Sequence, residues 1–286
     1  QADALARQKK FVRRKVKVTG SNFAQTLVFG FLDNPKMSYR EMKQAAGLSN
    51  LEISGQGLEQ RFNEASANFM KAVLENAVQQ MICSSSDVNL DLLNRFSKIH
   101  IQDGSVIGLP DECVAVWRGV QPDGKKGCSA LKLHVSLEYK SGHLSGPTLA
   151  NGREQDRKSP WFCQTLQKGE LRLGDLGFFD LDQLEADAKA GGFWITRHKH
   201  EVGLQKNGQE LALLSFLQGQ ARDQIDVPVE LGKNHQLPCR LIAFKADERT
   251  AEKRKRKLRE YARKKGLSLS EKRLQLAGWT LFLTNA

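Results

Sequence analysis

Two short segments of the sequence share a pattern that could bring carboxylates together. In each, two apolar residues alternate with other side chains and an aspartate follows: Ile99-x-Ile101-x-Asp103 and Leu171-x-Leu173-x-Asp175. Such alternation is typical of a β-strand with inward-facing apolar residues. If the two strands are neighbours, Asp103 and Asp175 could bind Mg²⁺, which prefers a few carboxylates together with phosphate oxygens and water. An aspartate at the end of a strand can also simply cap a loop, and the pattern alone leaves both interpretations open.

Positive charge is concentrated in two places. The 286 residues include 44 Lys or Arg and 32 Asp or Glu, which gives a net charge of +12. Residues 7–17 hold seven basic and no acidic residues, and residues 249–273 hold twelve basic and three acidic ones. Such patches on an otherwise mildly acidic chain indicate a polyanionic partner, most often nucleic acid, although solvated helices have the same composition. The densest run gives the candidate DNA-binding residues: Lys253, Arg254, Lys255, Arg256 and Lys257.

The first 95 residues are expected to be helical. Ser38 and Glu41 form a capping box, and Gly47 is the expected end of that helix. A second helix is expected from Ser54, because the apolar residues that follow recur at steps of three and four: Leu58, Phe62, Ala65, Phe69 and Val73. This pair resembles a helix-turn-helix, but the connection of about seven residues exceeds the usual 3–4. A plain helical bundle fits the pattern better.

From residue 98 onward the periodicity predicts a mixed sheet with helices on its faces, and hence an α/β fold. Strands are expected at 99–103, 130–138, 144–149, 171–175 and 193–197, and helices at 154–167 and 180–190. Further short strands are expected at 210–217, 225–231 and 237–244. A basic helix over 248–265 that ends at Gly266 and a strand over 278–284 complete the pattern.

Several classes of protein and site are disfavoured. The apolar runs are too short for a spanning helix, and no signal peptide is visible. The odd, scattered cysteines never form C-x-x-C, which argues for a reducing compartment and against a disulfide framework or zinc finger. A P-loop is absent, so an ATP-driven mechanism has no support. His198 and His200 lack a ligand partner at metal spacing, so we interpret them as polar strand residues.

The order of several short motifs resembles that of DDE transposases of insertion-sequence family four. Asp103-Gly104-Ser105, Leu109-Pro110 and Trp117-x-Gly119 resemble the family's first-aspartate region, and Asp175-Leu176-Gly177-Phe178-Phe179 resembles its second. Between and after them lie further similar segments: Lys132-Leu133-His134, Gly142-x-Leu144-x-Gly146, Gly152-Arg153-x-x-Asp156, Trp194-x-Thr196-Arg197, Gly278-Trp279 and Leu283-Thr284-Asn285. Gln155 stands where the family often has a histidine. The resemblance spans nearly the whole chain.

The resemblance implies an RNase H-like catalytic domain with Asp103 and Asp175 as ligands of Mg²⁺, for which Mn²⁺ could substitute. It implies hydrolysis at transposon ends, then attack of the freed 3′-hydroxyl on target DNA, by a homodimer in the bacterial cytoplasm that joins the nucleoid when bound. The expected domains are a helical, DNA-binding domain (1–95), the first part of the core (96–198), a β-rich insertion (199–247), and a basic helix with a returning strand (248–286).

The same resemblance implies a third acidic residue that these 286 residues do not contain. The family's glutamate belongs to a Tyr-x₂-Arg-x₃-Glu-x₆-Lys signature, expected after Thr284-Asn285, and Ser268 occupies the glutamate position of the internal candidate at Tyr261. A metal site that lacks a principal charge loses orders of magnitude in rate, so we expect this chain alone to be a poor nuclease. Two alternatives remain: a transposase remnant that only binds transposon ends, and a basic RNA- or protein-binding module with structural aspartates.

Overall fold

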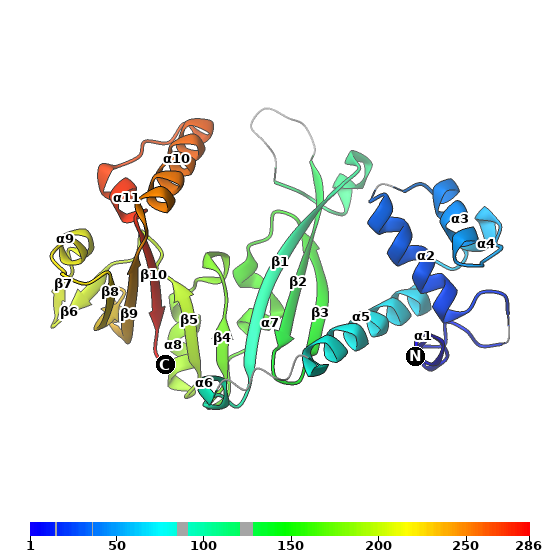
Figure 1. Ribbon diagram of the computed structural model, residues 1–286, viewed down its shortest axis with the longest axis horizontal. Coiled ribbons are helices and arrows are strands. Elements are labelled where there is room, and N and C mark those ends of the chain that lie inside the picture. Colours follow the sequence, from blue (N-terminus) through cyan, green and yellow to red (C-terminus); the bar gives the residue numbers. More distant parts are fainter. Residues whose placement is uncertain (15, 36, 85–90, 121–127) are drawn as a thin grey trace. The chain divides into compact units, whose positions relative to one another are not determined.

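A computed structural model describes residues 1–14, 16–35, 37–84, 91–120 and 128–286. The chain forms two compact units (Figure 1). Unit 1 comprises Gln1–Asp87 with Ser141–His143, and unit 2 comprises Val88–Lys140 with Leu144–Ala286. The finer division of the second unit at residues 198 and 247 stays a prediction. In the described parts of the chain, no helix is both long and apolar enough to cross a membrane.

Unit 1 is a small helical bundle built around phenylalanines. Its helices are α1 (Ala2–Gln8), α2 (Gly20–Asp33), α3 (Tyr39–Leu48), α4 (Gly55–Glu59) and α5 (Glu64–Ser84). Capping boxes at Thr19 and at Ser38 fix the starts of α2 and α3, as the sequence predicts for the latter. Phe11 stacks on Phe69 with ring centroids 5.2 Å apart, and both rings are buried with Phe23.

Two expectations for unit 1 are wrong. Gly47 lies inside α3, which runs on to Leu48, and the chain turns at Asn50, whose φ is 53°. The helix expected from Ser54 through residue 73 is broken, because the Asn63 side chain accepts a hydrogen bond from the Ser66 N–H and starts a new helix. The helix after the turn, α4, therefore has only five residues. The bundle describes the unit better than a helix-turn-helix.

Unit 2 is organised by one sheet of ten strands (Figure 1). Their order across the sheet is β3-β2-β1-β4-β5-β10-β9-β8-β6-β7. The strands are β1 (Ile99–Leu109), β2 (Ser129–Glu138), β3 (His143–Asn151), β4 (Leu171–Leu173), β5 (Phe193–Arg197), β6 (Leu204–Lys206), β7 (Gln209–Glu210), β8 (Gln224–Leu231), β9 (Leu237–Lys245) and β10 (Trp279–Thr284). β4 is parallel to β1 and to β5, whereas β2 is antiparallel to β1 and β10 is antiparallel to β5 and β9.

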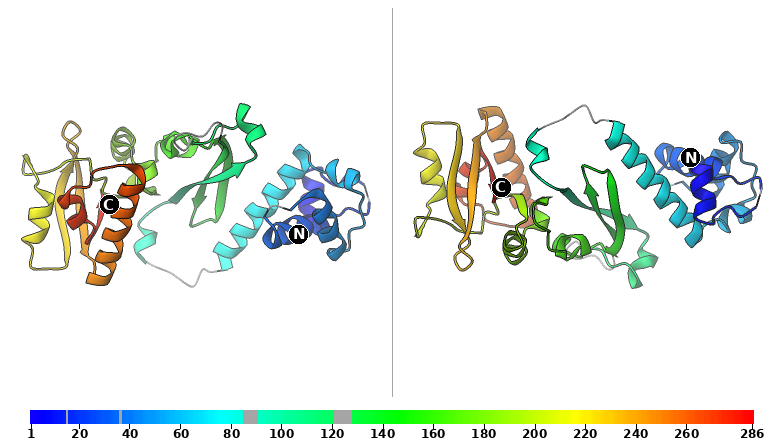
Figure 2. Two further views of the ribbon diagram at one scale, coloured as in Figure 1. Left: turned by 90° about the horizontal axis from the view of Figure 1, so that it is seen from above. Right: turned by 90° about the horizontal axis from the view of Figure 1, so that it is seen from below.

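Helices and 3₁₀ turns form the connections between the strands of unit 2. They are α6 (Asp91–Asn94), α7 (Pro160–Cys163), α8 (Leu181–Lys189), α9 (Leu213–Gln218), α10 (Glu248–Lys265) and α11 (Glu271–Leu276), with 3₁₀ turns η1 (Asp111–Ala115), η2 (Asp156–Lys158) and η3 (Leu176–Phe178). Figure 2 shows α7 and α8 on one side of strands β1–β5. Arg172 in β4 ties both helices to this side, because it donates to the Phe162 carbonyl in α7 and to the Asp187 carboxylate in α8. Both charged side chains are buried.

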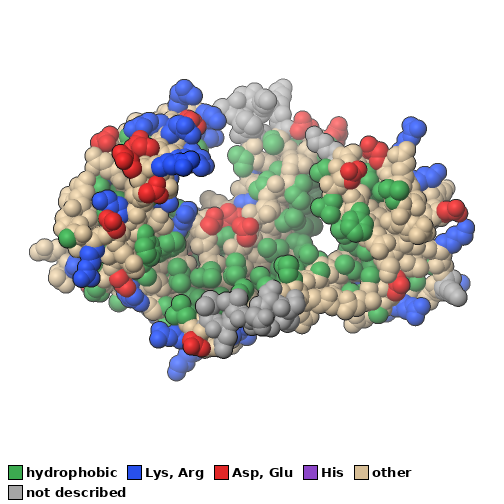
Figure 3. Space-filling model, viewed as in Figure 1, with side chains coloured by type: hydrophobic (Ala, Val, Ile, Leu, Met, Phe, Trp, Pro, Cys, Tyr) green, Lys and Arg blue, Asp and Glu red, His purple; other side chains and the backbone are tan. Residues whose placement is uncertain are grey.

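The covered side of β2 is polar, which reverses the usual amphipathic pattern. Lys132, His134 and Ser136 are buried, whereas the alternating Leu133 and Val135 are only half-buried. The opposite side of the sheet is apolar, and Figure 3 shows hydrophobic side chains gathered over β1, β4 and β5. The main apolar core of unit 2 lies farther along the sheet, on β5, β8, β9 and β10.

Most elements of unit 2 match the sequence-based expectation, with three corrections. Residues 210–217, expected as a strand, are mostly helical: β7 ends at Glu210 and α9 begins at Leu213, because Leu213 and Leu217 bury one helical face in the main core. Residues 154–167 form only η2 and α7, where Pro160 starts the short helix. Asp103 lies in the middle of β1 rather than at its end, and Ile101 before it is 36% exposed rather than inward-facing.

Candidate carboxylate site and adjoining basic surface

Of the two aspartates that the sequence singles out, Asp103 lies within β1, and Asp175 lies two residues after the end of β4, the strand that pairs with β1. In the parallel pair of β1 and β4, Ile99 is opposite Leu171 and Ile101 is opposite Leu173. The pairing extends as far as Ile101 and Leu173, two residues before Asp103 and Asp175. Both side chains are exposed. The sequence-based argument required the strands before the two aspartates to be neighbours, and β1 and β4 are indeed paired.

Asp175 also has a structural role. β4 ends at Leu173, and Asp175 becomes the N-cap of the 3₁₀ turn η3, where its Oδ1 accepts a hydrogen bond of 2.9 Å from the Gly177 N–H. The loop-cap interpretation is thus correct for this residue. It does not exclude metal binding, because a carboxylate has two oxygens and several lone pairs. The cap fixes the side chain at the edge of the sheet.

A third carboxylate, Asp156, lies beside this turn. Asp156 begins η2, and its Oδ1 is 2.9 Å from Lys132 Nζ and 3.5 Å from His134 Nε2, both on β2. Lys132 Nζ also donates to the Glu154 carbonyl at 2.6 Å. Sequence reasoning quoted Asp156 only within a motif. The pattern that could have identified it is the alternation of polar residues along β2, which are buried and therefore need partners.

Two glycines allow Asp156 to approach so closely. A Cβ atom on Gly104 would lie 2.5 Å from Asp156 Oδ1, and a Cβ atom on Gly177 would lie 2.6 Å from Asp156 Oδ2. Either contact is shorter than real side chains tolerate, so both positions need glycine while Asp156 is in place. The carboxylate therefore lies between the residue after Asp103 and the turn that Asp175 caps. Figure 3 shows acidic side chains gathered above the apolar face, beyond the upper end of β4.

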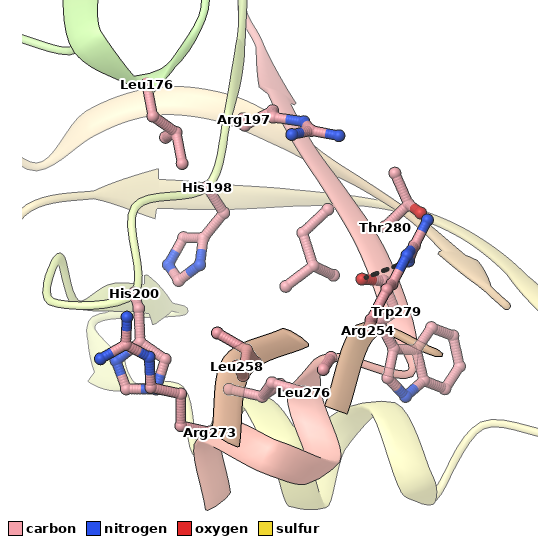
Figure 4. Close-up of a pocket in the computed structure, with 12 residues that line it drawn as sticks. Leu176, Arg197, His198, His200, Arg254, Leu258, Arg273, Leu276, Trp279 and Thr280 are labelled. Atoms are coloured by element: carbon pink, nitrogen blue, oxygen red, sulfur yellow. Dashed lines mark hydrogen bonds between the residues drawn. The ribbon is translucent and has the colours of Figure 1, made fainter. Parts of the chain in front are cut away.

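A basic cavity of about 380 Å³ adjoins the carboxylates through Leu176, the residue after Asp175 (Figure 4). β5 and the loop after it supply Arg197, His198 and His200, while α10 and α11 supply Arg254 and Arg273. The remaining lining is mostly apolar: Leu258, Leu276, Ala277, Trp279, Thr280 and Leu281. No carboxylate lines the cavity, so its field favours an anion such as a phosphate.

The surroundings of the two histidines of this cavity lower the pKa of both. Burial lowers the pKa of His198, whose Nε2–H donates to the Val202 carbonyl at 3.0 Å. Burial also lowers the pKa of His200, and the positive charges of Arg273 and Lys272 lower it further. Both lie after the end of β5 at Arg197, so the expectation that they are strand residues is wrong. Their interpretation as polar residues rather than metal ligands stays a prediction. In the described ranges, no group of three or more His, Cys, Asp or Glu side chains is arranged to hold a metal ion.

The basic run of α10 divides into side chains of different accessibility. Lys253, Arg256 and Lys257 are exposed, whereas Lys255 and Arg254 are half-buried. Lys255 pairs with Glu252 at 2.7 Å, and Arg254 donates to the Trp279 carbonyl at the cavity wall. Figure 3 shows Lys and Arg side chains gathered over α10, and the surface is hollowed between this helix and β1. Arg256 pairs with Glu260 at 3.9 Å, which leaves Lys253 and Lys257 as exposed cations of this run without an ion pair among the described residues.

No family model matches the chain. It is 27% identical to the transposase for insertion sequence element IS231F of Bacillus thuringiensis subsp. israelensis, over 99% of this chain and 64% of that protein. It is 25% identical to the IS231B transposase of subsp. berliner and 23% identical to the IS1151 transposase of Clostridium perfringens. Those matches cover 99% and 100% of this chain and 63% and 64% of the two relatives. The chain is similar to insertion-sequence transposases. It spans slightly less than two thirds of their length.

Proposed function

We propose that this chain is part of a DNA transposase that cleaves and joins phosphodiester bonds at the ends of an insertion sequence, with Asp103 and Asp175 in the active site. The observation that carries the proposal is the parallel pairing of β1 and β4, which ends two residues before each of these carboxylates. The relatives, which are named as transposases, support the same function over nearly the whole chain. The order β3-β2-β1-β4-β5, with β4 and β5 parallel to β1, supports an RNase H-like core.

The two aspartates suit a hard divalent cation. Both are exposed oxygen donors, and Mg²⁺ commonly takes one or two carboxylates plus substrate phosphate oxygens and water. When bound, Mg²⁺ or Mn²⁺ would lower the pKa of the attacking water or hydroxyl and stabilise the leaving oxygen. The protein holds Asp175 in place through its cap on η3 and Asp103 through the β1 ladder. We assign these two residues as metal ligands.

The positive surface beside the carboxylates would hold the DNA. Lys253 and Lys257 lie one turn apart on α10 and are exposed, so both can contact phosphates of one strand. Arg197 and Arg254 line the cavity next to Asp175, where a phosphate near the cleaved bond would be held. Transposition joins two ends, and we expect a homodimer to bring them together.

A second candidate is a protein that binds transposon ends without cutting them. The observation that favours it is the absence of three clustered metal ligands among the residues that the structure describes. The two candidates differ in that only the first needs a metal ion. End binding would then be independent of Mg²⁺, and the aspartates would serve only as loop and strand residues.

The test measures Mn²⁺ binding and metal-dependent nicking of insertion-sequence end DNA for Asp103→Asn and Asp175→Asn. In a form of the protein that cleaves DNA, we expect either change to lower the nicking rate by about a thousandfold or more, because charge in a preorganised site provides most of the catalysis. Each should also weaken Mn²⁺ binding while end binding persists. Asp182→Asn, which removes an exposed carboxylate on α8, is the control. Unchanged Mn²⁺ binding in both variants would favour the binding-only candidate.

A further inference from the structure

An ion pair lies on the covered side of the sheet, between β2 and the η2 turn. Lys132 on β2 is 8% exposed, and its Nζ donates to the Asp156 carboxylate at 2.9 Å and to the Glu154 carbonyl at 2.6 Å. Loss of one partner of such a pair is costly, because the other charge then stays buried without its counterpart. The pair therefore fixes η2, which begins at Asp156, against β2.

The carboxylate of Asp156 contacts the glycines that neighbour the two candidate aspartates. Oδ1 lies 2.5 Å from the position that a Cβ on Gly104 would take, and Oδ2 lies 2.6 Å from the same position on Gly177. Gly104 follows Asp103 on β1, and side chains alternate along a strand, so the Asp103 side chain lies on the other side of the sheet. Gly177 donates its N–H to Asp175 Oδ1 at 2.9 Å. The ion pair thus supports the backbone beside each aspartate.

Two further contacts tie the segment around η2 to the segment around η3. Arg157 in η2 lies 3.2 Å from the carboxylate of Asp180, which caps the start of α8. The Phe162 ring in α7 lies with its centroid 5.8 Å from that of Phe178 in η3. A 3₁₀ turn of three residues has few hydrogen bonds of its own, so its position depends on such neighbours. A movement of η2 would therefore move η3 and the residue that caps it.

We propose that Lys132 and Asp156 form a positioning pair for the carboxylate site, which holds η3 in place and thereby keeps Asp175 capped and oriented. An exposed aspartate beside a short turn would otherwise adopt several orientations, and a binding site needs supporting residues that restrict them. The role of Asp175 as a ligand rests on the proposed function, whereas the positioning of the turn does not. Neither Lys132 nor Asp156 contacts the metal ion in this arrangement.

The test compares loss of the Asp156 side chain with a change that keeps its shape. Asp156→Ala removes the contact with Gly177 and leaves Lys132 without its carboxylate. We expect the Gly177 amide, followed by NMR hydrogen exchange without metal, to exchange faster. Mn²⁺ affinity, measured by calorimetry on the full 286-residue chain, should fall by about tenfold. Lys132→Met should act in the same direction. Asp156→Asn can still accept from Lys132 and should stay close to the native protein in both readouts.

A control variant separates positioning from general stability. Leu217→Ala leaves a cavity in the main core, because Leu217 on α9 is 1% exposed, and should lower the free energy of unfolding. At temperatures where this variant is folded, neither Gly177 exchange nor Mn²⁺ affinity should change. If Leu217→Ala matches Asp156→Ala in both readouts, or if Gly177 exchange in Asp156→Ala equals that of the native chain, the positioning role is refuted.

The two readouts also separate this proposal from the function on which it rests. If Gly177 exchange responds as expected but Asp103→Asn and Asp175→Asn leave Mn²⁺ binding unchanged, the proposed function fails and the pair positions the turn alone. If those two variants weaken Mn²⁺ binding while Asp156→Ala leaves it unchanged, the metal site stands and the positioning role is refuted.

Discussion

At the scale of single residues, the site depends on side chains whose roles are set by burial rather than by type. Lys132 and His134 would be surface residues in most strands, but here the polar side of β2 is the covered one. Alternation in the sequence shows that a strand is present and which residues share a side. It does not show which side faces the helices, and this is why Asp156 could not be assigned a role from the sequence. For Asp103 and Asp175 the shared pattern suggested a common site. The pairing of β1 and β4 that this site requires is present, and the role of the two aspartates as ligands stays a prediction.

His198 makes stability depend on pH. Burial lowers its pKa below the value of about 6.5 expected in the unfolded chain. The unfolded state therefore binds more protons below that pH, so the stabilisation is complete above about pH 6.5 and is lost as the pH falls toward the folded-state pKa. Urea unfolding at pH 7.5 and 5.5 should show a lower free energy of unfolding at the acidic pH. His198→Gln, which can still donate to Val202, should reduce this difference. An identical difference in the variant would contradict the assignment.

At the scale of elements, local signals identified most helices and strands, and tertiary contacts decided the exceptions. The capping box at Ser38 and the left-handed Gly266 after α10 act within a few residues, so the sequence predicts them correctly. Residues 210–217 have the composition of a strand, but Leu213 and Leu217 are four apart and face one core. That core is built by strands distant in sequence. No local pattern contains this information.

Gly47 offers a direct check at this scale. Replacing a glycine in a left-handed C-cap would destabilise the fold. Gly47 instead lies inside α3, and no atom lies within 4 Å of the position that a Cβ would take. Gly47→Ala should therefore raise the free energy of unfolding of unit 1 by about 0.5–1 kcal/mol, because glycine is a poor residue in a helix interior. Urea titration followed by circular dichroism measures the change. Gly266→Ala, at a φ of 62°, should have the opposite sign.

At the scale of the whole molecule, charge is distributed in a way that matches a nucleic-acid partner. The cations over α10 border the hollow in unit 2 where the acidic side chains lie (Figure 3). Because the positive and the negative side chains lie apart, a polyanion can approach the positive ones while the carboxylates remain available to a metal cation. The bound cation would then offset the repulsion between the carboxylates and phosphate. The net charge of +12 alone indicates a partner. Only the structure shows that α10 and the carboxylates belong to the same unit.

The contribution of α10 can be measured through salt. Each phosphate contact adds about 0.9 to the slope of log affinity against log salt concentration. Replacing Lys253 and Lys257 together by Ala should therefore lower the slope for duplex DNA by up to about 2. Lys233→Ala, in the turn between β8 and β9 and paired with Glu210, is the matched control. An unchanged slope in the double variant would show that these lysines remain solvated in the complex.

The central place of β10 governs the order in which unit 2 can assemble. Residues 279–284 follow every other strand in the sequence, yet they lie between β5 and β9 and join the two halves of the sheet. During synthesis, β9 therefore keeps one strand edge unpaired until residues 279–284 emerge. Unpaired edges and contacts distant in sequence slow folding and favour association with other chains. The position of one short strand thus sets how long the nascent chain exposes an unpaired edge.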